Sequence, residues 1–316
     1  MMANRRPRLV ITARTMVSVV DNFAEQVEAS GWDLSWSVPT GQAFSATELT
    51  EALQGFDAAI IGDDEASSEF FTNVHPELRL LVKWGVGTDS IDRVAAEASG
   101  VTVRSTPGVF GAEVADLAMG YVLALARNIL QTHEAVRKGD WVHPPGSSLS
   151  GKTLSIIGLG DVGRNLADRA KPFGMVVKYV DPHVDRSPVA LKCMNVNQAA
   201  ERADFLVLTC PSTAETRGIA SKSLFDLMTP GAFFVNVARG DLVNEIDLVD
   251  ALNSGQLSAA ALDVYCEEPL GKSSPLRGCD NIIFGAHNGS NTNEALLRAS
   301  ETALDIVLTS RKGGLR

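Results

Sequence analysis

The chain has 316 residues, enough for two domains, because single hydrophobic cores stop growing at roughly 250–300 residues. Hydrophobic residues make up 45% and charged residues 21%, as in ordinary soluble globular proteins. The net charge of -10 argues against a nucleic acid or an anionic membrane as the main partner. A few arginines in a cleft can still hold a small anion.

The cysteines have no CxxC spacing, so we expect free thiols in a reducing compartment and no metal site; they are Cys193, Cys210, Cys266 and Cys279. Cys266 either lines a site or is a small packed hydrophobe. The basic start contains Arg5-Arg6, but the apolar run after it is broken at Arg14, too soon for an export signal. No apolar helix reaches the ~20 residues that a bilayer requires. We therefore expect a cytoplasmic protein.

The first hundred residues alternate short apolar runs with helical patterns, which predicts a parallel α/β sheet. The apolar runs lie near 8–12, 33–38, 58–61, 80–84 and 101–104, and Ile91–Ala98 before Gly100 has helical spacing with a glycine C-cap. Residues 113–127 predict a helix that is apolar nearly all round, which must be covered by its own chain or by a second subunit. A loop is expected over Lys138–Ser150.

A second alternating series begins at residue 152. Six strands are predicted at 153–158, 175–180, 205–209, 232–236, 259–263 and 281–284, which fits a doubly wound dinucleotide-binding fold. A last helix is predicted over about 292–310, with its apolar residues on one face. We expect it to pack back on the first domain and make that domain discontinuous.

A glycine-rich turn follows the strand that ends at Ile157. Gly158 permits the tight turn, Gly160 lets a pyrophosphate approach the backbone, and Gly163 lets helix and strand pack closely. Asp181 ends the next strand, where a carboxylate accepts bonds from ribose hydroxyls and repels a 2′-phosphate, which favours NAD over NADP. The nearby Arg186 weakens that preference. The alternative, glycines that serve only a strand–helix turn, leaves the acid unexplained.

Three candidates for hydride chemistry follow three strands of the second series: Arg239, Glu268 and His287. The carboxyl ends of parallel strands share one edge, where such sheets bind ligands. A cation can hold a carboxylate, and a histidine with a carboxylate partner can move a proton. The competing interpretations are a surface arginine, a solvated Glu267-Glu268 turn and a structural histidine. Glu267 is the competitor for Glu268, and the remaining histidines are expected to be surface or structural: His75, His133, His143 and His183.

The glycine motif, the Val-Asn-Val-Ala-Arg-Gly segment at 235–240, Leu-Asp-Val with Glu-Pro at 262–269, and His-Asn-Gly at 287–289 together resemble the D-isomer-specific 2-hydroxyacid dehydrogenase family, D-3-phosphoglycerate dehydrogenases included. The likeness covers about Lys83 to Thr292. It implies an α/β protein of two doubly wound parallel-sheet domains and, in this family, a homodimer. Residues 1–104 with 288–316 would form a discontinuous, flavodoxin-like substrate domain, and 105–287 an inserted Rossmann NAD-binding domain.

The resemblance also implies roles for single residues. Arg239 would bind the substrate carboxylate and carbonyl oxygen, His287 would be the acid/base, and Glu268 would fix its tautomer and raise its pKa. Val86 and Gly87 would cradle the carboxylate through backbone N–H groups. Asp263 would take the nicotinamide amide, and Cys210 with Pro211 would form the adenine-side wall. Further cofactor contacts are implied for Asp161, Val162, Thr216, Val237, Ala238 and Gly289.

Three positions depart from the family pattern. Ser105 replaces a frequent Asn, Gly285-Ala286 replace Thr-Pro before the histidine, and Asp116 replaces a frequent Glu. The first two alter the expected cleft wall, so they bear on which acid is bound. Trp141 is expected to reach a partner subunit's pocket.

The expected activity is hydride transfer between NAD(H) and a small anionic D-2-hydroxy or 2-oxo acid. The alternatives are oxidation of a mimic (phosphonate, phosphite or formate) and a non-enzymatic NAD-sensing interaction protein on the same fold. No regulatory domain of the kind that many phosphoglycerate dehydrogenases append is expected.

Overall fold

The computed structural model describes residues 5–41 and 43–312. The chain folds as two compact units: unit 1 comprises residues 1–110 and 291–316, and unit 2 comprises residues 111–290. The divisions fall later than the 104/105 and 287/288 boundaries expected from the sequence. The ring of Phe110 packs 5.3 Å from that of Trp84 inside unit 1, and the backbone of Gly289 is hydrogen-bonded inside unit 2. Residues 1–4 and 313–316 of the expected substrate domain lie outside the described residues.

Unit 1 is a five-stranded parallel sheet in the order β2-β1-β3-β4-β5, which is the flavodoxin-like order. Its strands are β1 (Arg8–Ile11), β2 (Asp33–Trp36), β3 (Ala58–Ile61), β4 (Leu80–Lys83) and β5 (Thr102–Ser105). Its helices are α1 (Arg14–Val17), η1 (Val20–Asn22), α2 (Ala24–Ala29), α3 (Ala46–Ala52), α4 (Ser68–Asn73), α5 (Arg93–Ala98) and α12 (Asn293–Lys312). Every residue of the central β3 and β4 is buried, which explains the apolar run of β3 and of the first three residues of β4.

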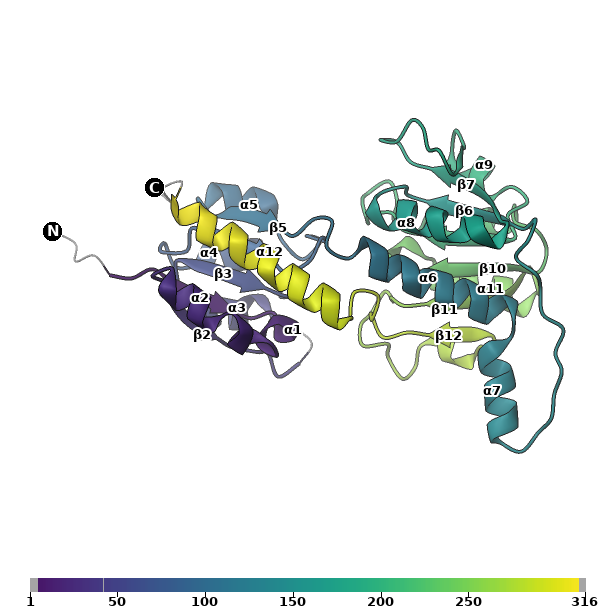
Figure 1. Cartoon of the computed structure of the whole chain (residues 1–316), viewed down its shortest axis with the longest axis horizontal. Helices are drawn as coiled ribbons and strands as arrows, with labels where there is room; N and C mark the ends of the chain where they lie inside the picture. The colour runs from purple at the N-terminus through teal and green to yellow at the C-terminus, as the bar shows by residue number, and fades with distance from the viewer. Residues whose placement is uncertain (1–4, 42, 313–316) are drawn as a thin grey trace. The chain divides into compact units, whose positions relative to one another are not determined.

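The last helix, α12, lies along the sheet of unit 1, although about 190 residues separate it from β5 (Figure 1). Ser300 on this helix accepts a hydrogen bond from Trp84 Nε1 at 3.1 Å, and Arg298 Nε donates to the carbonyl of Val109 at 3.1 Å. The prediction that this helix packs back on the first domain is confirmed.

Unit 2 is a seven-stranded parallel sheet in the order β12-β11-β10-β9-β6-β7-β8, the doubly wound order of a dinucleotide-binding fold with one strand more. The strands are β6 (Thr153–Ile157), β7 (Val176–Val180), β8 (Leu191–Lys192), β9 (Phe205–Leu208), β10 (Ala232–Asn236), β11 (Leu257–Leu262) and β12 (Ile282–Phe284). The expected count of six was wrong. The extra strand, β8, has two exposed residues at the sheet edge and therefore no apolar run.

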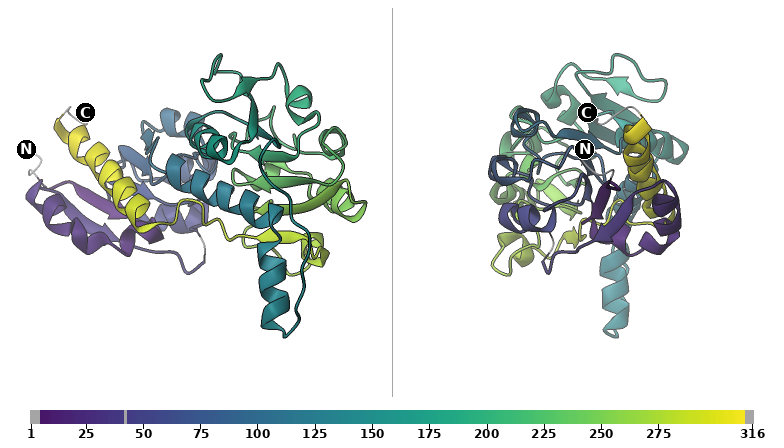
Figure 2. Two further views of the ribbon diagram at one scale, coloured as in Figure 1. Left: turned by 45° about the vertical axis from the view of Figure 1, so that its right-hand side comes forward. Right: turned by 90° about the vertical axis from the view of Figure 1, so that its left-hand side faces the viewer.

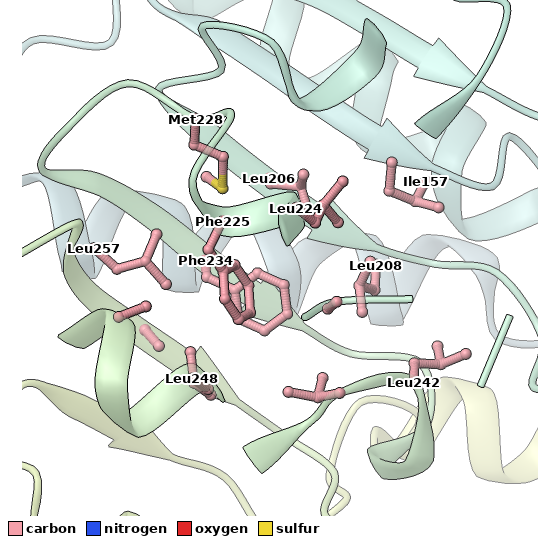
Figure 3. Close-up of a cluster of buried hydrophobic side chains, with 14 of the residues drawn as sticks. Ile157, Leu206, Leu208, Leu224, Phe225, Met228, Phe234, Leu242, Leu248 and Leu257 are labelled. Carbon is pink, nitrogen blue, oxygen red and sulfur yellow. The ribbon is translucent and has the colours of Figure 1, made fainter. Parts of the chain in front are cut away.

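Both faces of this sheet are covered, so successive residues of one strand enter different cores. Phe205 and Val207 face α6 and α8, whereas Leu206 and Leu208 belong to the opposite core, which Figure 3 shows. In that core the rings of Phe225 and Phe234 meet edge to face, with centroids 5.3 Å apart. The remaining helices are α6 (Gly111–Ala126), α7 (Ile129–Arg137), α8 (Asp161–Ala170), η2 (Lys171–Phe173), α9 (Val196–Ala200), α10 (Lys222–Phe225), η3 (Gly240–Leu242), α11 (Glu245–Asn253) and η4 (Pro275–Gly278).

Helix α7 projects from the rest of unit 2 and is followed by a long segment without helix or strand, as Figures 1 and 2 show. None of its residues is buried. Three of them are large and apolar all the same: Ile129, Leu130 and Val136 are 50%, 46% and 45% exposed. Among the described residues, no helix has the length and apolarity needed to cross a membrane.

Candidate active site

The glycine-rich turn lies between β6 and α8 and has the geometry that a dinucleotide requires. Gly158 has φ +96°, and a Cβ there would lie 2.8 Å from the backbone N and Cα of Cys210. A Cβ on Gly163 would overlap the carbonyl oxygen of Gly158. Apart from its chain neighbours, no atom of the residues that the structure describes would lie within 4 Å of a Cβ on Gly160, which is the extended N-cap residue of α8. The turn therefore leaves open space at the positive end of a helix, as a pyrophosphate needs.

Asp181 lies directly after β7, beside that turn. Its Oδ2 accepts the N–H of Leu159 at 2.7 Å, and its Oδ1 accepts the N–H of His183 at 2.8 Å. Each carboxylate oxygen has a second acceptor site, so ribose hydroxyls can still donate to Asp181. The carboxylate that would set the preference for NAD over NADP thus also holds the glycine-rich turn in place.

The expected adenine-side residues lie after β9. Cys210 is buried, and burial raises the pKa of its thiol to about 11, so the thiol stays neutral; its part in an adenine-side wall stays a prediction. The hydroxyl of Thr216 donates to the carbonyl of Pro211 at 2.8 Å and closes a turn. Val237 and Ala238, after β10, are each 8% exposed. Asp161 and Val162 occupy the first turn of α8, next to the glycines.

His287 and Glu268 are paired in unit 2: His287 Nδ1 lies 2.7 Å from Glu268 Oε2. The second carboxylate oxygen accepts the backbone N–H of Tyr265 at 3.0 Å, which fixes the plane of the carboxylate. Because Nδ1 faces a carboxylate, we assign a proton to Nδ1, which donates it to Glu268. Nε2 is then the nitrogen that can exchange a proton with a ligand. The His287 side chain is 42% exposed, so a ligand can reach it.

Arg239 lies just after β10, at the same sheet edge as the segments that carry Glu268 and His287. Its neighbour Asn236 is fully buried and holds this segment, donating to the carbonyl of Arg239 at 2.7 Å and accepting from the N–H of Ala238 at 3.0 Å. The Arg239 guanidinium donates to the carbonyl of Ala238 at 2.7 Å. A partly buried guanidinium at a strand end suits an anionic ligand.

Asp263, after β11, is 1% exposed, and its carboxylate accepts three hydrogen bonds from the protein. Its carboxylate accepts from the N–H groups of Asn288 at 3.1 Å and Gly289 at 2.9 Å, and from the hydroxyl of Tyr121 at 3.3 Å. The sequence assigned Asp263 and Gly289 to the cofactor, but it gave no sign that Tyr121 belongs to the site. The two residues Tyr121 and Asp263 are 142 positions apart, and only the packing of α6 beside β11 brings them together.

Val86 and Gly87 follow β4 in unit 1, so the structure describes them apart from the residues of unit 2. The loop is fixed at Gly85, whose N–H donates to Thr106 Oγ1 at 2.8 Å and whose carbonyl accepts the N–H of Thr106 at 2.9 Å. Val86 is 52% exposed. Their part in binding a carboxylate stays a prediction.

The other candidates make contacts of their own. The sulfur of Cys266 lies 3.4 Å from the carbonyl of Gly240. The bond of His287 is to Glu268 rather than to the exposed Glu267. The four remaining histidines are exposed: His75, His133, His143 and His183. Within the described part of the chain, no group of three or more His, Cys, Asp or Glu side chains could hold a metal ion.

Comparisons with known proteins identify the family of the chain. The NAD binding domain of the D-isomer specific 2-hydroxyacid dehydrogenases matches residues 119–289, more than half of the chain. A glyoxylate reductase from Aeropyrum pernix is 30% identical over 321 residues, covering 98% of this chain and 94% of that protein. A D-3-phosphoglycerate dehydrogenase from Methanocaldococcus jannaschii is 34% identical over 284 residues, and there the alignment spans 54% of the relative's length, about half.

A solved protein of Thermus thermophilus has the same fold, with a TM-score of 0.87, 29% identity and 97% of each chain covered. The chain belongs to the D-isomer specific 2-hydroxyacid dehydrogenase family. It is an NAD-binding α/β protein whose second unit contains that family's NAD binding domain.

Proposed function

We propose that this chain is an NAD-dependent oxidoreductase that transfers a hydride between the nicotinamide and carbon 2 of a small D-2-hydroxy or 2-oxo acid. The observation that carries the proposal is the 2.7 Å pair of His287 and Glu268 on the sheet edge that also carries Arg239. Unit 2 would be the NAD-binding domain, and unit 1, with its Val86-Gly87 loop, the substrate domain.

The residues of the chain supply binding and a proton, and NADH supplies the hydride when it is bound. In the reductive direction Arg239 holds the substrate carboxylate and polarises the carbonyl. His287 gives the proton on Nε2 to the carbonyl oxygen as carbon 2 gains the hydride, so that C=O becomes CH–OH. Glu268 stabilises the imidazolium that must supply this proton. In the reverse direction, the substrate hydroxyl gives its proton to Nε2 of His287.

The glycine-rich turn fits the cofactor on its own geometry. The space at Gly160, beside the N-terminus of the ten-residue helix α8, suits the pyrophosphate. The Asp181 carboxylate suits the adenosine ribose and opposes a 2′-phosphate, so we propose a preference for NADH over NADPH. Arg186, five residues beyond, is exposed and counteracts that preference only in part.

The test is NADH absorbance with a panel of 2-oxo acids, for the wild type beside His287→Ala. We expect turnover of at least one acid and a loss of roughly 10²–10⁴-fold in the variant, the usual contribution of a general acid. Binding of NADH without any turnover would favour the NAD-sensing interaction protein. Turnover of formate or phosphite alone would favour the mimic, and formate has no hydroxyl proton for His287 to take.

We also propose that the chain forms a homodimer through α7 and the segment after it. Helix α7 has no buried residue, and it exposes Ile129, Leu130 and Val136. The segment after it adds Trp141 and Val142, which are 79% and 40% exposed. Apolar groups gathered this way are typical of subunit interfaces. Light scattering should give twice the chain mass for the wild type. A wild type that elutes as a monomer would contradict the proposal.

Trp141 would then extend to the partner's substrate site. It lies on the segment after α7, and within the chain its ring meets that of His143 at 5.9 Å. A Trp141→Ala variant should alter substrate preference or KM. If both stay as in the wild type, this role is wrong.

A cytoplasmic location is also proposed. It is supported by four free cysteines, of which Cys193, Cys210 and Cys279 are buried, since reduced thiols are usual in a reducing compartment. Cell fractionation tests it, and recovery of the protein outside the cytoplasm would contradict it.

A further inference from the structure

A buried carboxylate organises the segment that carries His287. Asp263 receives the N–H groups of Asn288 and Gly289 on its side chain, and its backbone carbonyl accepts the N–H of His287 at 2.7 Å. Three successive amides are thus fixed on one residue. His287 itself has φ +51°, a left-handed conformation that a non-glycine residue adopts only when its surroundings impose it. The three hydrogen bonds to Asp263 hold the backbone in this conformation.

Tyr121 completes the set of donors to this carboxylate. Its hydroxyl lies 3.3 Å from Asp263 Oδ1, and its side chain comes from α6, an element that contributes none of the three catalytic candidates. Burial and the Asp263 charge both raise the pKa of the Tyr121 hydroxyl, so it remains a proton donor at every working pH. A buried carboxylate with an unfilled acceptor site is costly, and the tyrosine fills it.

Gly285 is the position that admits the tyrosine. A Cβ there would overlap both the Tyr121 hydroxyl and Asp263 Oδ1, and it would lie 3.0 Å from Asp263 Cα. Any other residue would therefore displace the hydroxyl. The carbonyl of Gly285 is held from the opposite side by the hydroxyl of Tyr265 at 2.8 Å. Gly285, where the family pattern often has Thr, thus leaves the space that the Tyr121 hydroxyl occupies.

We propose that Tyr121 is a positioning residue of the active site, which holds Asp263 and through it the backbone of residues 287–289, so that the His287 imidazole stays on Glu268. This inference rests on the proposed function, because it concerns the proton donor of that reaction. The residue acts through Asp263 and does not touch the reacting atoms.

The test compares Tyr121→Phe, which removes one oxygen atom, with Tyr179→Phe as a matched control. Tyr179 is fully buried in the same unit, and its hydroxyl donates over the same 3.3 Å, to the carbonyl of Val184. We expect kcat of Tyr121→Phe to fall about 10-fold, less than the ~100-fold that a 1 Å misplacement of a reacting group can cost. The Kd for NADH should change less than kcat, because the glycine-rich turn and Asp181, which would hold the pyrophosphate and the adenosine ribose, are untouched.

Two readouts separate positioning from simple structural support. First, the midpoint of the pH profile of kcat/KM should move in the same direction as in Glu268→Gln, because the imidazole is held less closely to its carboxylate. Second, deuterium exchange in the protein without substrate should be faster at residues 287–289 in Tyr121→Phe and unchanged there in Tyr179→Phe. Equal kcat, equal midpoint and equal exchange in the two variants would overturn the inference.

Gly285→Ala gives an independent check. It should reduce kcat at least as much as Tyr121→Phe, and the double variant should lose less than the product of the two single losses, because both changes break one contact. Independent, multiplying losses would contradict a shared contact. If the wild type turns over no 2-oxo acid, the proposed function fails, and the exchange at residues 287–289 alone decides whether Tyr121 holds this segment.

Discussion

Nδ1 of His287 lies 2.7 Å from Oε2 of Glu268, and the other carboxylate oxygen of Glu268 accepts the backbone N–H of Tyr265. We expect Glu268→Gln to keep this shape and lose the charge. Without the negative charge the imidazolium is less favoured, so in the reductive direction activity should be lost at a lower pH than in the wild type. kcat/KM should fall about 10- to 100-fold at neutral pH. The pH profile measures this, and an unmoved midpoint would remove Glu268 from the role.

Arg239→Lys tests the guanidinium. An ammonium group is a point charge and cannot form two parallel bonds to a carboxylate, so we expect kcat/KM to fall roughly 100-fold, through a higher KM for the acid and a lower kcat. Steady-state kinetics over a range of acid concentrations measures it. Arg217 and Asp241 form an exposed ion pair at 3.1 Å in the same unit, so Arg217→Lys is a suitable control with near-normal activity expected. Near-normal turnover in Arg239→Lys would exclude Arg239 from catalysis.

Asp181→Ala should relax the cofactor preference. Removal of the carboxylate removes the repulsion of a 2′-phosphate, and we expect the ratio of kcat/KM for NADH over NADPH to fall on the order of 10-fold. Affinity for both cofactors should also fall, because Asp181 holds the N–H of Leu159 in the glycine-rich turn. Asp185, whose side chain is 95% exposed, is the control, and Asp185→Ala should leave the ratio unchanged. An unchanged ratio in Asp181→Ala would count against the role.

Two glycines of the turn should respond differently to alanine. Gly163→Ala forces a methyl group onto the carbonyl of Gly158 and should cost about 3 kcal/mol of folding free energy, as overpacking of backbone against backbone does. Gly160→Ala meets no protein atom, so the melting temperature should hold while NADH binding weakens. Thermal melts and NADH titration read the two effects. Equal behaviour of the two variants would refute the assignment.

Cys266 should be a slow nucleophile. Burial of the thiol and the nearby Glu245 carboxylate raise its pKa from 9.0 to about 11. Only the thiolate reacts, so near pH 8 this higher pKa predicts alkylation by iodoacetamide about 100-fold slower than for an ordinary thiol. The rate should rise about tenfold for each further pH unit until the thiol is ionised. Glu245→Gln should speed the reaction. Peptide mass spectrometry of labelled protein measures both rates, and fast labelling at neutral pH would contradict the raised pKa.

Several parts of this fold follow from the sequence because their signals are local. Strands buried on both faces, such as β3 and β9, are short apolar runs, and the glycine-rich turn is a contiguous motif. β8 could not be found, because its two residues are exposed and only their pairing with β7 defines a strand. α7 was also missed, since its apolar residues lie outside any core and give no periodic face against the sheet.

The candidate site shows the same limit. His287, Glu268 and Arg239 could be predicted as candidates because each follows a strand, and strand ends converge by topology. The three bonds on Asp263 and the part of Tyr121 depend on side chains of distant elements that meet in the folded unit. No spacing rule joins α6 to the segment after β12. Such contacts become visible only once the helix is packed.

The return of α12 to the first unit has a consequence for synthesis on the ribosome. Unit 2 is one continuous stretch and can fold as soon as residue 290 has emerged, whereas Trp84 waits for Ser300 before its indole N–H is bonded. The later part of the gene therefore encodes the part of the protein that is finished first. Until α12 has been made, the first unit therefore lacks the helix that covers one side of its sheet.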